Sequence, residues 1–212
     1  AVDILSPTKT TNGNAGLRLL SLQPERSYDS EFENLEVCYY LLNGRGSLGF
    51  PKTGGQSKWV VESDTAMWVP PGMKHTIINS GEGPFRLLVA YCTPNRGERG
   101  QKRVVKISDL PVYEMVGFRS RSIFSPEVLD KLGASRCIGV DLETLTPLSV
   151  LDTHAHEEEI LFVLRGKGFV MIGDDKFEVV PGSTVYTGPH LPHSVHNTTQ
   201  DNFQYLVFEY SP

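Results

Sequence analysis

The chain has 212 residues, of which 39% are hydrophobic and 21% are charged, with a formal net charge of −5. This composition is ordinary for a globular protein, and the length is sufficient to bury a sizeable core. The acidic balance and the lack of any basic run argue against a nucleic-acid or anionic membrane surface. No apolar run approaches the roughly 20 residues that a membrane helix requires.

The cysteines and the first residues bear on the compartment. Cys38, Cys92 and Cys137 are odd in number and lack CxxC spacing, which predicts reduced, buried thiols in a cytoplasmic protein. The stretch Ala1–Pro7 has no basic start followed by an apolar core, so no signal peptide is expected.

Short segments rich in β-branched and aromatic residues recur along the chain between Gly and Pro signals, which predicts an all-β sandwich or barrel. The predicted strands are Leu17–Leu22, Glu36–Leu42, Trp59–Val61, Phe85–Cys92, Gly139–Leu145, Ile160–Leu164, Gly168–Ile172 and Phe203–Tyr210.

One helix is predicted, directly after Ser125. Ser125 is a suitable N-cap, Pro126 suits the first turn, Glu127 favours the positive end, and Gly133 can end the helix. A weaker helical turn is predicted near Ser108. Both lie in a segment, residues 96–135, that is expected to connect two lobes.

An internal repeat organises the rest of the sequence. Leu20–Gly46 aligns with Leu142–Gly168 at an offset of about 122, and Ser63–Asn79 aligns with Gly182–Asn197 at an offset of about 118. A longer hairpin loop around Pro51–Gln56 explains the difference. The chain is therefore predicted to hold two copies of one β unit, in residues 1–95 and 136–212.

A histidine cluster lies in the second repeat. His154 and His156 are two apart on a predicted strand, so their side chains are expected to share a face. Three glutamates follow at 157–159, and the later segment 188–197 offers three further histidines, His190, His193 and His196. Alternation turns His196 away from the face shared by His193. The pattern predicts a metal site.

These residues resemble the two-part motif of the cupin family. The motif is carried by His154-x-His156, by Glu159 and Gly166, and by Gly182, Pro189-x-x-Pro192-His193 and Asn197. Each repeat has a version of it, so the chain is similar to a bicupin. The resemblance implies two tandem double-stranded β-helix (jelly-roll) barrels with a short helical connection.

The resemblance assigns metal ligation to His154, His156, Glu159 and His193. Imidazoles and one carboxylate suit Fe, Mn, Ni, Cu or Zn, with Fe or Mn favoured by the resemblance. Family spacing prefers Glu159 over Glu158, although the residues alone leave both open, and the two remaining glutamates are expected to face solvent. Asn197 is expected to tie down a turn.

Two positions depart from the family pattern, because Leu148 and His190 stand where glycine is usual. The first change is expected to affect only a turn. His190 adds an imidazole near the barrel mouth, where it is either a general base, a hydrogen-bond donor to a ligand, or an exposed loop residue.

The first repeat lacks the ligand set and is predicted to be metal-free. Alignment places Phe32, Asn34 and Val37 opposite His154, His156 and Glu159, and only His75 survives, opposite His193. A shifted alignment that combines His75 with an acidic residue would rescue a weak site. The acidic candidates are Asp29, Glu31 and Glu36.

Alternation also predicts the lining of the second barrel, which is expected to be mostly apolar. The lining candidates are Leu161, Val163, Phe169, Met171, Tyr186, Tyr205 and Phe208. A carboxylate substrate would require an arginine, and the arginine candidates are Arg119, Arg121, Arg136 and Arg165.

The resemblance implies a mononuclear metalloenzyme acting on a small organic substrate, with oxygen-dependent, dioxygenase-like cleavage as the leading class. The catalytic candidates are Glu159, His190 and Tyr186. A redox-neutral isomerase, lyase or hydrolase is the alternative, and a non-catalytic ligand-binding cupin is a third hypothesis. The expected partner is a small molecule, and both a monomer and a homodimer are compatible with the sequence.

Overall fold

The computed structural model describes residues 1–11, 13–30, 32, 34–51, 58–96 and 100–211. The chain divides into two compact units. The first comprises Ala1–Lys9, Gly13–Asp109 and Asp130–Arg136, and the second comprises Thr10–Asn12, Leu110–Leu129 and Cys137–Pro212. The segment 96–135, expected as a connection, is divided between the units and supplies strands to both.

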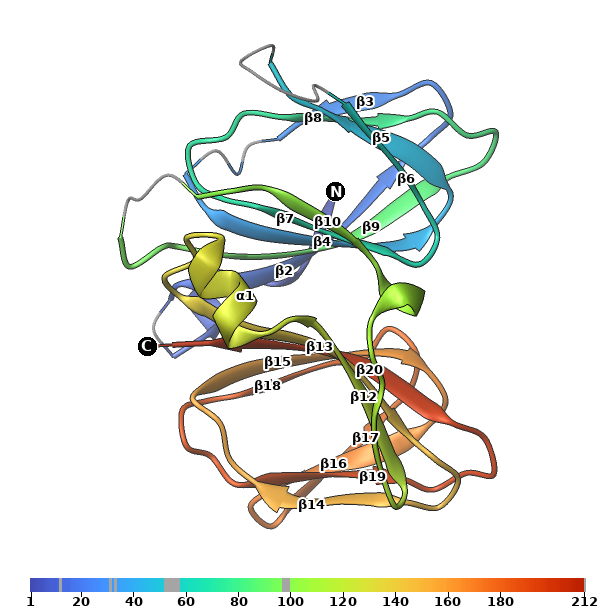
Figure 1. Cartoon of the computed structure of the whole chain (residues 1–212). Coiled ribbons are helices and arrows are strands. Elements are labelled where there is room, and N and C mark those ends of the chain that lie inside the picture. Colours follow the sequence, from blue (N-terminus) through green and yellow to red (C-terminus); the bar gives the residue numbers. More distant parts are fainter. Residues whose placement is uncertain (12, 31, 33, 52–57, 97–99, 212) are drawn as a thin grey trace. The chain divides into compact units, whose positions relative to one another are not determined.

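The first unit consists of two facing antiparallel sheets (Figure 1). The larger sheet has the order β1 (Val2–Leu5), β2 (Ala15–Leu22), β9 (Phe85–Cys92), β4 (Glu36–Asn43), β7 (Thr65–Val69) and β10 (Arg103–Lys106). The smaller sheet has the order β3 (Ser27–Asp29), β8 (Thr76–Asn79), β5 (Arg45–Gly49) and β6 (Lys58–Glu62). Alternate residues of both sheets form one apolar core between them.

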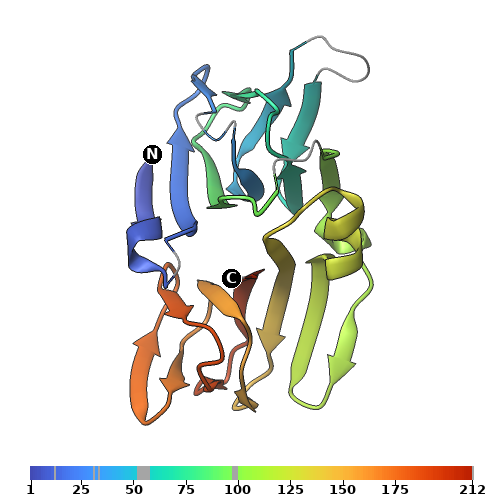
Figure 2. The same ribbon diagram turned by 90° about the vertical axis from the view of Figure 1, so that its left-hand side faces the viewer.

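The second unit repeats this architecture. Its larger sheet has the order β11 (Tyr113–Met115), β12 (Phe118–Phe124), β13 (Cys137–Leu145), β20 (Phe203–Tyr210), β15 (Glu158–Arg165) and β18 (Thr184–Thr187). Its smaller sheet has the order β14 (Val150–His154), β19 (His193–Asn197), β16 (Gly168–Ile172) and β17 (Asp175–Val179). Figure 2 shows β11 and β12 as a yellow-green hairpin. The predicted all-β fold of two jelly-roll barrels is confirmed.

The predicted helix is present as α1 (Pro126–Lys131). The Val128 N–H donates to the Ser125 hydroxyl at 3.4 Å, and Gly133 follows the helix at a φ of 82°, as the capping pattern predicted. Short 3-10 turns occur at Pro7–Lys9 and Ile107–Asp109, the latter close to the predicted turn at Ser108. No helix in the described part of the chain is long and apolar enough to cross a membrane.

Strand pairing shows that the repeats are equivalent residue by residue. Val37 lies opposite Val69 and Tyr91 in the first unit, while Glu159 lies opposite Thr187 and Glu209 in the second. Because the register is the same in both barrels, each strand position of one barrel has an equivalent position in the other. The three cysteines are buried and form no disulfide bond with one another, as expected.

The predicted lining of the second barrel needs a correction on β16. Leu161 and Val163 do belong to the core, but the core residues of β16 are Val170 and Ile172. Because neighbouring side chains of a strand point to opposite faces, Phe169 and Met171 lie on the outer face. The Phe169 ring stacks there on His196, with ring centroids 4.2 Å apart.

Candidate metal centre

Four side chains of the second unit converge at one end of the barrel. His154 ends β14, His193 begins β19, and Glu159 is the second residue of β15. Together with His156 they offer ligand atoms that all lie within 4.8 Å of one another. The structure thus brings together the four residues that the sequence indicated.

His156 reaches this cluster from a turn rather than from a strand. We expected His154 and His156 to share one strand face, but β14 ends at His154. The pairing of β14 with β19 shifts register between Leu151 and His154, and the chain then turns into β15. The His190 backbone N–H donates to the His156 carbonyl at 2.7 Å, which fixes this turn.

Each of the three imidazoles has its Nδ1 atom engaged by an acceptor. His154 Nδ1 lies 2.6 Å from the Asp152 carbonyl, and His193 Nδ1 lies 3.0 Å from the Leu191 carbonyl. His156 Nδ1 lies 3.1 Å from Glu209 Oε1. Carbonyl and carboxylate oxygens only accept, so Nδ1 carries the proton and the Nε2 lone pair is left for a ligand.

The Nε2 atoms and the Glu159 carboxylate form a set of potential metal-binding atoms that face one another. Glu159 Oε2 lies 3.5 Å from Nε2 of both His156 and His193. Among the described residues, the buried His193 Nε2 has no hydrogen-bond partner. A buried imidazole nitrogen is costly to leave unsatisfied. A divalent transition metal would satisfy it, and the donor set fits one.

Solvent reaches the cluster from one side. His193 and Glu159 are buried, whereas the His156 side chain is 36% exposed and His154 is half-buried. Three imidazoles and one carboxylate occupy four coordination positions, which leaves room for a further ligand on a six-coordinate ion. The arrangement can therefore hold a metal and present it to a small molecule.

Charge also couples the histidines to Glu159. Burial alone lowers the pKa of His193, but the nearby Glu159 carboxylate outweighs it and raises the pKa overall. Burial lowers the pKa of His154, and the neighbouring His193 and His156 lower it further. A bound cation would replace the proton that this cluster otherwise shares.

Glu158 faces away from the cluster, which decides between the two candidate glutamates. Neighbouring residues on β15 point to opposite faces, and the Tyr186 hydroxyl donates to Glu158 Oε1. Our expectation that Glu158 faces solvent was wrong, because its side chain is fully buried. Glu159 is the carboxylate placed among the histidines.

The structure does not bring Tyr186 to the cluster. Tyr186 lies opposite Ile160, on the outer face of β18. Its hydroxyl accepts a hydrogen bond from the Thr11 backbone N–H at 2.7 Å in addition to its bond with Glu158. Burial and this carboxylate raise the pKa of Tyr186. We therefore assign Tyr186 no role at the metal centre.

His190 lies at the rim. Its side chain is 75% exposed, with Nε2 3.6 Å from Glu157 Oε2. The backbone φ is 57° at His190 and 58° at Leu148. Both residues stand where the family pattern has glycine. Gly72 of the first repeat, which aligns with His190, also has a positive φ, 78°. These turns keep the left-handed conformation although glycine, which adopts it most easily, is missing.

Sequence reasoning missed three further acidic residues near the cluster. Asp141, Glu143 and Glu209 occupy core-facing positions on β13 and β20, because their partners in register include core residues. Burial, with repulsion from nearby carboxylates, raises the pKa of Asp141 to about 6 and that of Glu143 to about 8. Alternation within the two predicted strands could have identified them.

The first barrel uses the equivalent position differently. His75 Nδ1 donates to the Met73 carbonyl at 2.8 Å, and its Nε2 accepts from the Tyr39 hydroxyl at 2.6 Å. Burial lowers the pKa of His75, so the neutral ring is favoured. Phe32, which aligns with His154 in the repeat, packs its ring on that of Tyr91, with ring centroids 4.8 Å apart.

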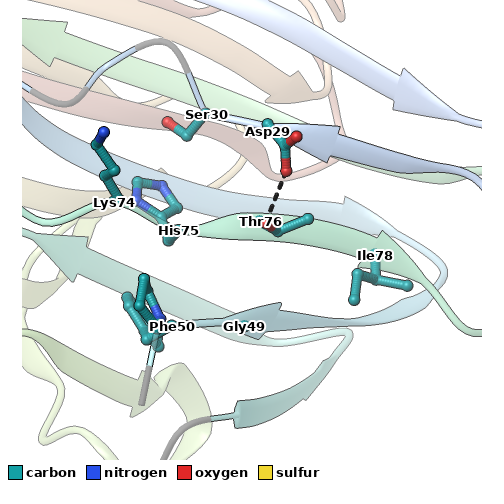
Figure 3. Close-up of a pocket in the computed structure, with 9 residues that line it drawn as sticks. Asp29, Ser30, Gly49, Phe50, Lys74, His75, Thr76 and Ile78 are labelled. Carbon is teal, nitrogen blue, oxygen red and sulfur yellow. Dashed lines mark hydrogen bonds between the residues drawn. The ribbon is translucent and has the colours of Figure 1, made fainter. Parts of the chain in front are cut away.

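The alternative acidic partners of His75 do not assemble a site. Asp29 accepts a hydrogen bond from the Thr76 hydroxyl at 2.7 Å (Figure 3), and Glu36 accepts from the backbone and hydroxyl of Ser135. Glu31 lies outside the described residues. Within the described residues of this unit, no group of three metal-binding side chains converges. His75 instead borders a pocket of about 690 Å³, beside Ser30 and Lys74 (Figure 3).

The arginine candidates do not face the metal cluster. Arg119 pairs with Glu114 at 3.0 Å, and Arg121, two residues further along β12, shares its outward face. Arg165 is exposed. Arg136 belongs to the first unit, where it donates to the Thr93 carbonyl at 2.6 Å.

Comparison with known protein families agrees with this geometry. A family model described as a cupin domain matches residues 142–209, a span that includes all four clustered residues. Residues 142–209 therefore match a cupin domain. The first unit repeats the same barrel architecture without the ligand set, so the described residues hold two barrels and one candidate metal centre.

Curated relatives match over short segments. An uncharacterized protein of Methanocaldococcus jannaschii is 33% identical over 73 residues, which are 33% of this chain and 58% of that protein. A glucose-6-phosphate isomerase of Thermococcus onnurineus is 34% identical over 65 residues, which are 30% of this chain and 34% of that protein. The matches therefore span only about a third to three-fifths of these relatives.

Solved cupin structures match nearly the whole chain. A structure of Bacillus subtilis oxalate decarboxylase, from a study of its Mn(II) centres, matches with a TM-score of 0.75 at 13% identity. The match covers 93% of this chain and 69% of that one. A cupin 2 conserved barrel domain protein from Leptotrichia buccalis gives 0.65 at 16% identity, covering 93% and 84%. These likenesses concern the fold.

Proposed function

We propose that this cupin is a mononuclear metal-dependent enzyme that acts on a small organic substrate. His154, His156, Glu159 and His193 are the proposed ligands, and iron or manganese is the favoured metal. The observation that carries the proposal is the geometry of the imidazoles. All three have Nδ1 occupied by an oxygen acceptor, while the buried His193 Nε2 faces the cluster without a partner among the described residues.

A metal held there would supply a Lewis acid and an open coordination position. The protein side chains then have separate roles. Glu209 orients His156 through Nδ1, at 3.1 Å. Glu159, at 3.5 Å from two Nε2 atoms, would help to hold the metal and is the carboxylate that could accept a proton from a substrate. The exposed His190 is the rim residue within reach of bulk solvent and is a candidate proton carrier.

Oxygen-dependent, dioxygenase-like cleavage is the reaction class that we propose first, because the three-His, one-Glu set leaves positions for both substrate and oxygen. A redox-neutral isomerase, lyase or hydrolase reaction is the second candidate. The similarity to glucose-6-phosphate isomerases supports this second class, since an isomerase moves protons without consuming an oxidant.

Oxygen consumption during turnover separates the two classes. Protein loaded with one metal at a time, iron or manganese first, would be mixed with enediols, flavonoids, small carboxylates and sugars in a sealed oxygen electrode. Oxygen uptake stoichiometric with substrate loss supports cleavage by oxygen. Turnover at an unchanged rate without oxygen supports the redox-neutral class and contradicts the first.

The matched control for these assays is a histidine outside the cluster. His193→Gln should abolish both metal uptake and turnover, while His196→Gln should retain both, because His196 lies on the outer face against Phe169. Ligand binding that survives His193→Gln, with no turnover in any metal form of the natural protein, would favour a non-catalytic ligand-binding cupin. We further propose that the first barrel is metal-free and has a structural role.

A further inference from the structure

Four carboxylates form a continuous wall on the larger sheet of the second barrel. Glu159 lies directly opposite Glu209, and Glu209 lies opposite Gly139. A Cβ atom at Gly139 would come within 2.7 Å of Glu209 Oε2, and Asp141 Oδ2 lies 3.5 Å from the same point. The two carboxylates therefore converge over this glycine. Glu143 lies two residues beyond Asp141 on the same face of β13 and continues the wall.

The wall starts at the opening of the barrel. The Glu209 side chain is 22% exposed and contacts the partly exposed His156. Asp141 and Glu143 are half-buried, and Glu143 lies opposite Tyr205. A molecule that reaches the exposed side of His156 from solvent therefore meets Glu209.

The fold does not require these acids, because the first barrel is built without them. By strand register, the first barrel has Val37 for Glu159, Tyr91 for Glu209, Arg18 for Asp141 and Leu20 for Glu143. Even the glycine is repeated, since a Cβ at Gly16 would meet the Tyr91 ring at 2.6 Å. The acids collected beside the metal cluster repel one another, and this repulsion adds to the burial that raises the pKa of Asp141 and Glu143.

In the described strands of this barrel, no lysine or arginine side chain pairs with Glu209, Asp141 or Glu143, and the basic groups against the wall are the imidazoles of His156 and His193. The core-facing positions of β12 next to the wall are Ser120 and Ser122, opposite Glu143 and Asp141. The two arginines of this strand, Arg119 and Arg121, alternate to the outer face. A dicarboxylate would therefore meet carboxylates and hydroxyls here, without the paired donors that recognise it.

We propose that the natural substrate of the metal centre presents hydroxyl or ammonium groups to Glu209 and Asp141, and that small dicarboxylates are poor ligands. This inference rests on the proposed function, since it assigns the substrate class of the same site. Carboxylates accept hydrogen bonds from hydroxyl and ammonium donors, whereas a dianion placed against them is repelled. A sugar, polyol, enediol or amino alcohol satisfies the wall.

Three probes of the same length test the proposal: glycerol, 2-amino-1,3-propanediol and malonate, which are neutral, cationic and dianionic. Their dissociation constants would be measured by ligand-observed NMR titration on metal-free and metal-loaded full-length protein, with metal content determined on the same samples. We expect the amino alcohol to bind at least about tenfold more tightly than malonate, and glycerol to lie between them.

Variants assign the preference to the wall. Asp141→Asn and Glu209→Gln should each weaken binding of the amino alcohol by about tenfold, as expected for one charge-assisted hydrogen bond. Asp174→Asn, an exposed carboxylate on the β16–β17 turn, removes the same charge and should change nothing. Circular dichroism confirms the fold of each variant.

Three results would overturn the inference. Malonate could bind as tightly as the amino alcohol, neither the amino alcohol nor glycerol could bind, or the wall variants could behave like Asp174→Asn. These results are distinguishable from failure of the proposed function. Absent metal uptake contradicts the metal centre, while the probe preference of the metal-free protein still tests the wall. Metal uptake together with a preference for malonate contradicts only the assignment of the substrate class.

Discussion

His75 and His193 occupy equivalent positions in the two barrels, yet their Nε2 atoms have opposite surroundings. Nε2 of His75 accepts a hydrogen bond from the Tyr39 hydroxyl at 2.6 Å. Nε2 of His193 is buried without such a partner in the described part of the chain and lies 3.5 Å from Glu159. The same backbone thus holds one histidine as a satisfied core residue and another as a candidate metal ligand.

Asn197 is predicted to be a strong determinant of stability. Its Nδ2 lies within hydrogen-bond distance of the carbonyls of Leu145, Thr146 and Asp201, at 2.7 to 3.2 Å. Asn197→Ala leaves buried acceptors unsatisfied and should lower the free energy of unfolding by about 2–4 kcal/mol. Urea unfolding measures it, with the exposed Asn202→Ala as control. A loss equal to that of the control would contradict this role.

Much of this fold could be predicted because the repeat and the period-two pattern are local signals. Phe85–Cys92, Gly168–Ile172 and Phe203–Tyr210 match their strands to the residue, and the Ser125 cap marked the helix. Short strands such as β3 and β11, with three residues each, carry too little pattern to be recognised. The face of β16 was misassigned because alternation alone does not fix which set of residues is buried.

The candidate metal centre was predictable to a similar degree. The four residues came from the spacing of a motif, which sequence displays directly. The acidic wall could not be predicted in this way. Glu209 and Asp141 are 68 positions apart in the numbering and come together only through the pairing of β13 with β20. The burial of Glu158 was likewise invisible, since the sequence does not show that Tyr186 supplies a hydrogen bond.

The Glu158–Tyr186 pair should affect stability without affecting metal binding. Tyr186→Phe removes the donor to a fully buried carboxylate and should lower the free energy of unfolding by about 1–3 kcal/mol. Metal content per chain should stay the same, because this pair lies on the outer face of the sheet. A variant of unchanged stability, or one that loses metal, would contradict the placement of Tyr186.

Leu148 should be replaceable by glycine with a gain in stability. It adopts a φ of 58° and is 60% exposed, so little packing is lost. Relief of a left-handed conformation gains about 1–2 kcal/mol, of which about 0.5–1 kcal/mol is returned as chain entropy. Thermal unfolding of Leu148→Gly should therefore shift upward, whereas Val150→Gly, in strand β14, should shift downward. A downward shift for both contradicts the argument.

The wall predicts how the stability of the metal-free protein depends on pH. The folded-state pKa values of Asp141, about 6, and Glu143, about 8, exceed the ordinary value of about 4. Between the unfolded-state and folded-state pKa values the folded state binds more protons than the unfolded state, so stability falls as pH rises. The slope approaches about 1.4 kcal/mol per pH unit for one carboxyl.

Urea unfolding at a series of pH values from about 5 to about 8 checks this dependence. Glu143→Gln should flatten the upper part of the profile, because it removes the group whose pKa is raised most in the wall. Asp174→Asn should leave the profile unchanged. A stability that rises with pH across this interval would show that the wall carboxyls are not buried together.

Elemental analysis of the full-length protein tests the central claim most directly. Protein purified without added metal, and again after loading with iron or manganese, would be compared with His193→Gln and with the control His75→Gln. The account predicts about one metal ion per chain in the natural protein and in His75→Gln, and none in His193→Gln. Equal metal content in both variants, or no metal in any form, would contradict it.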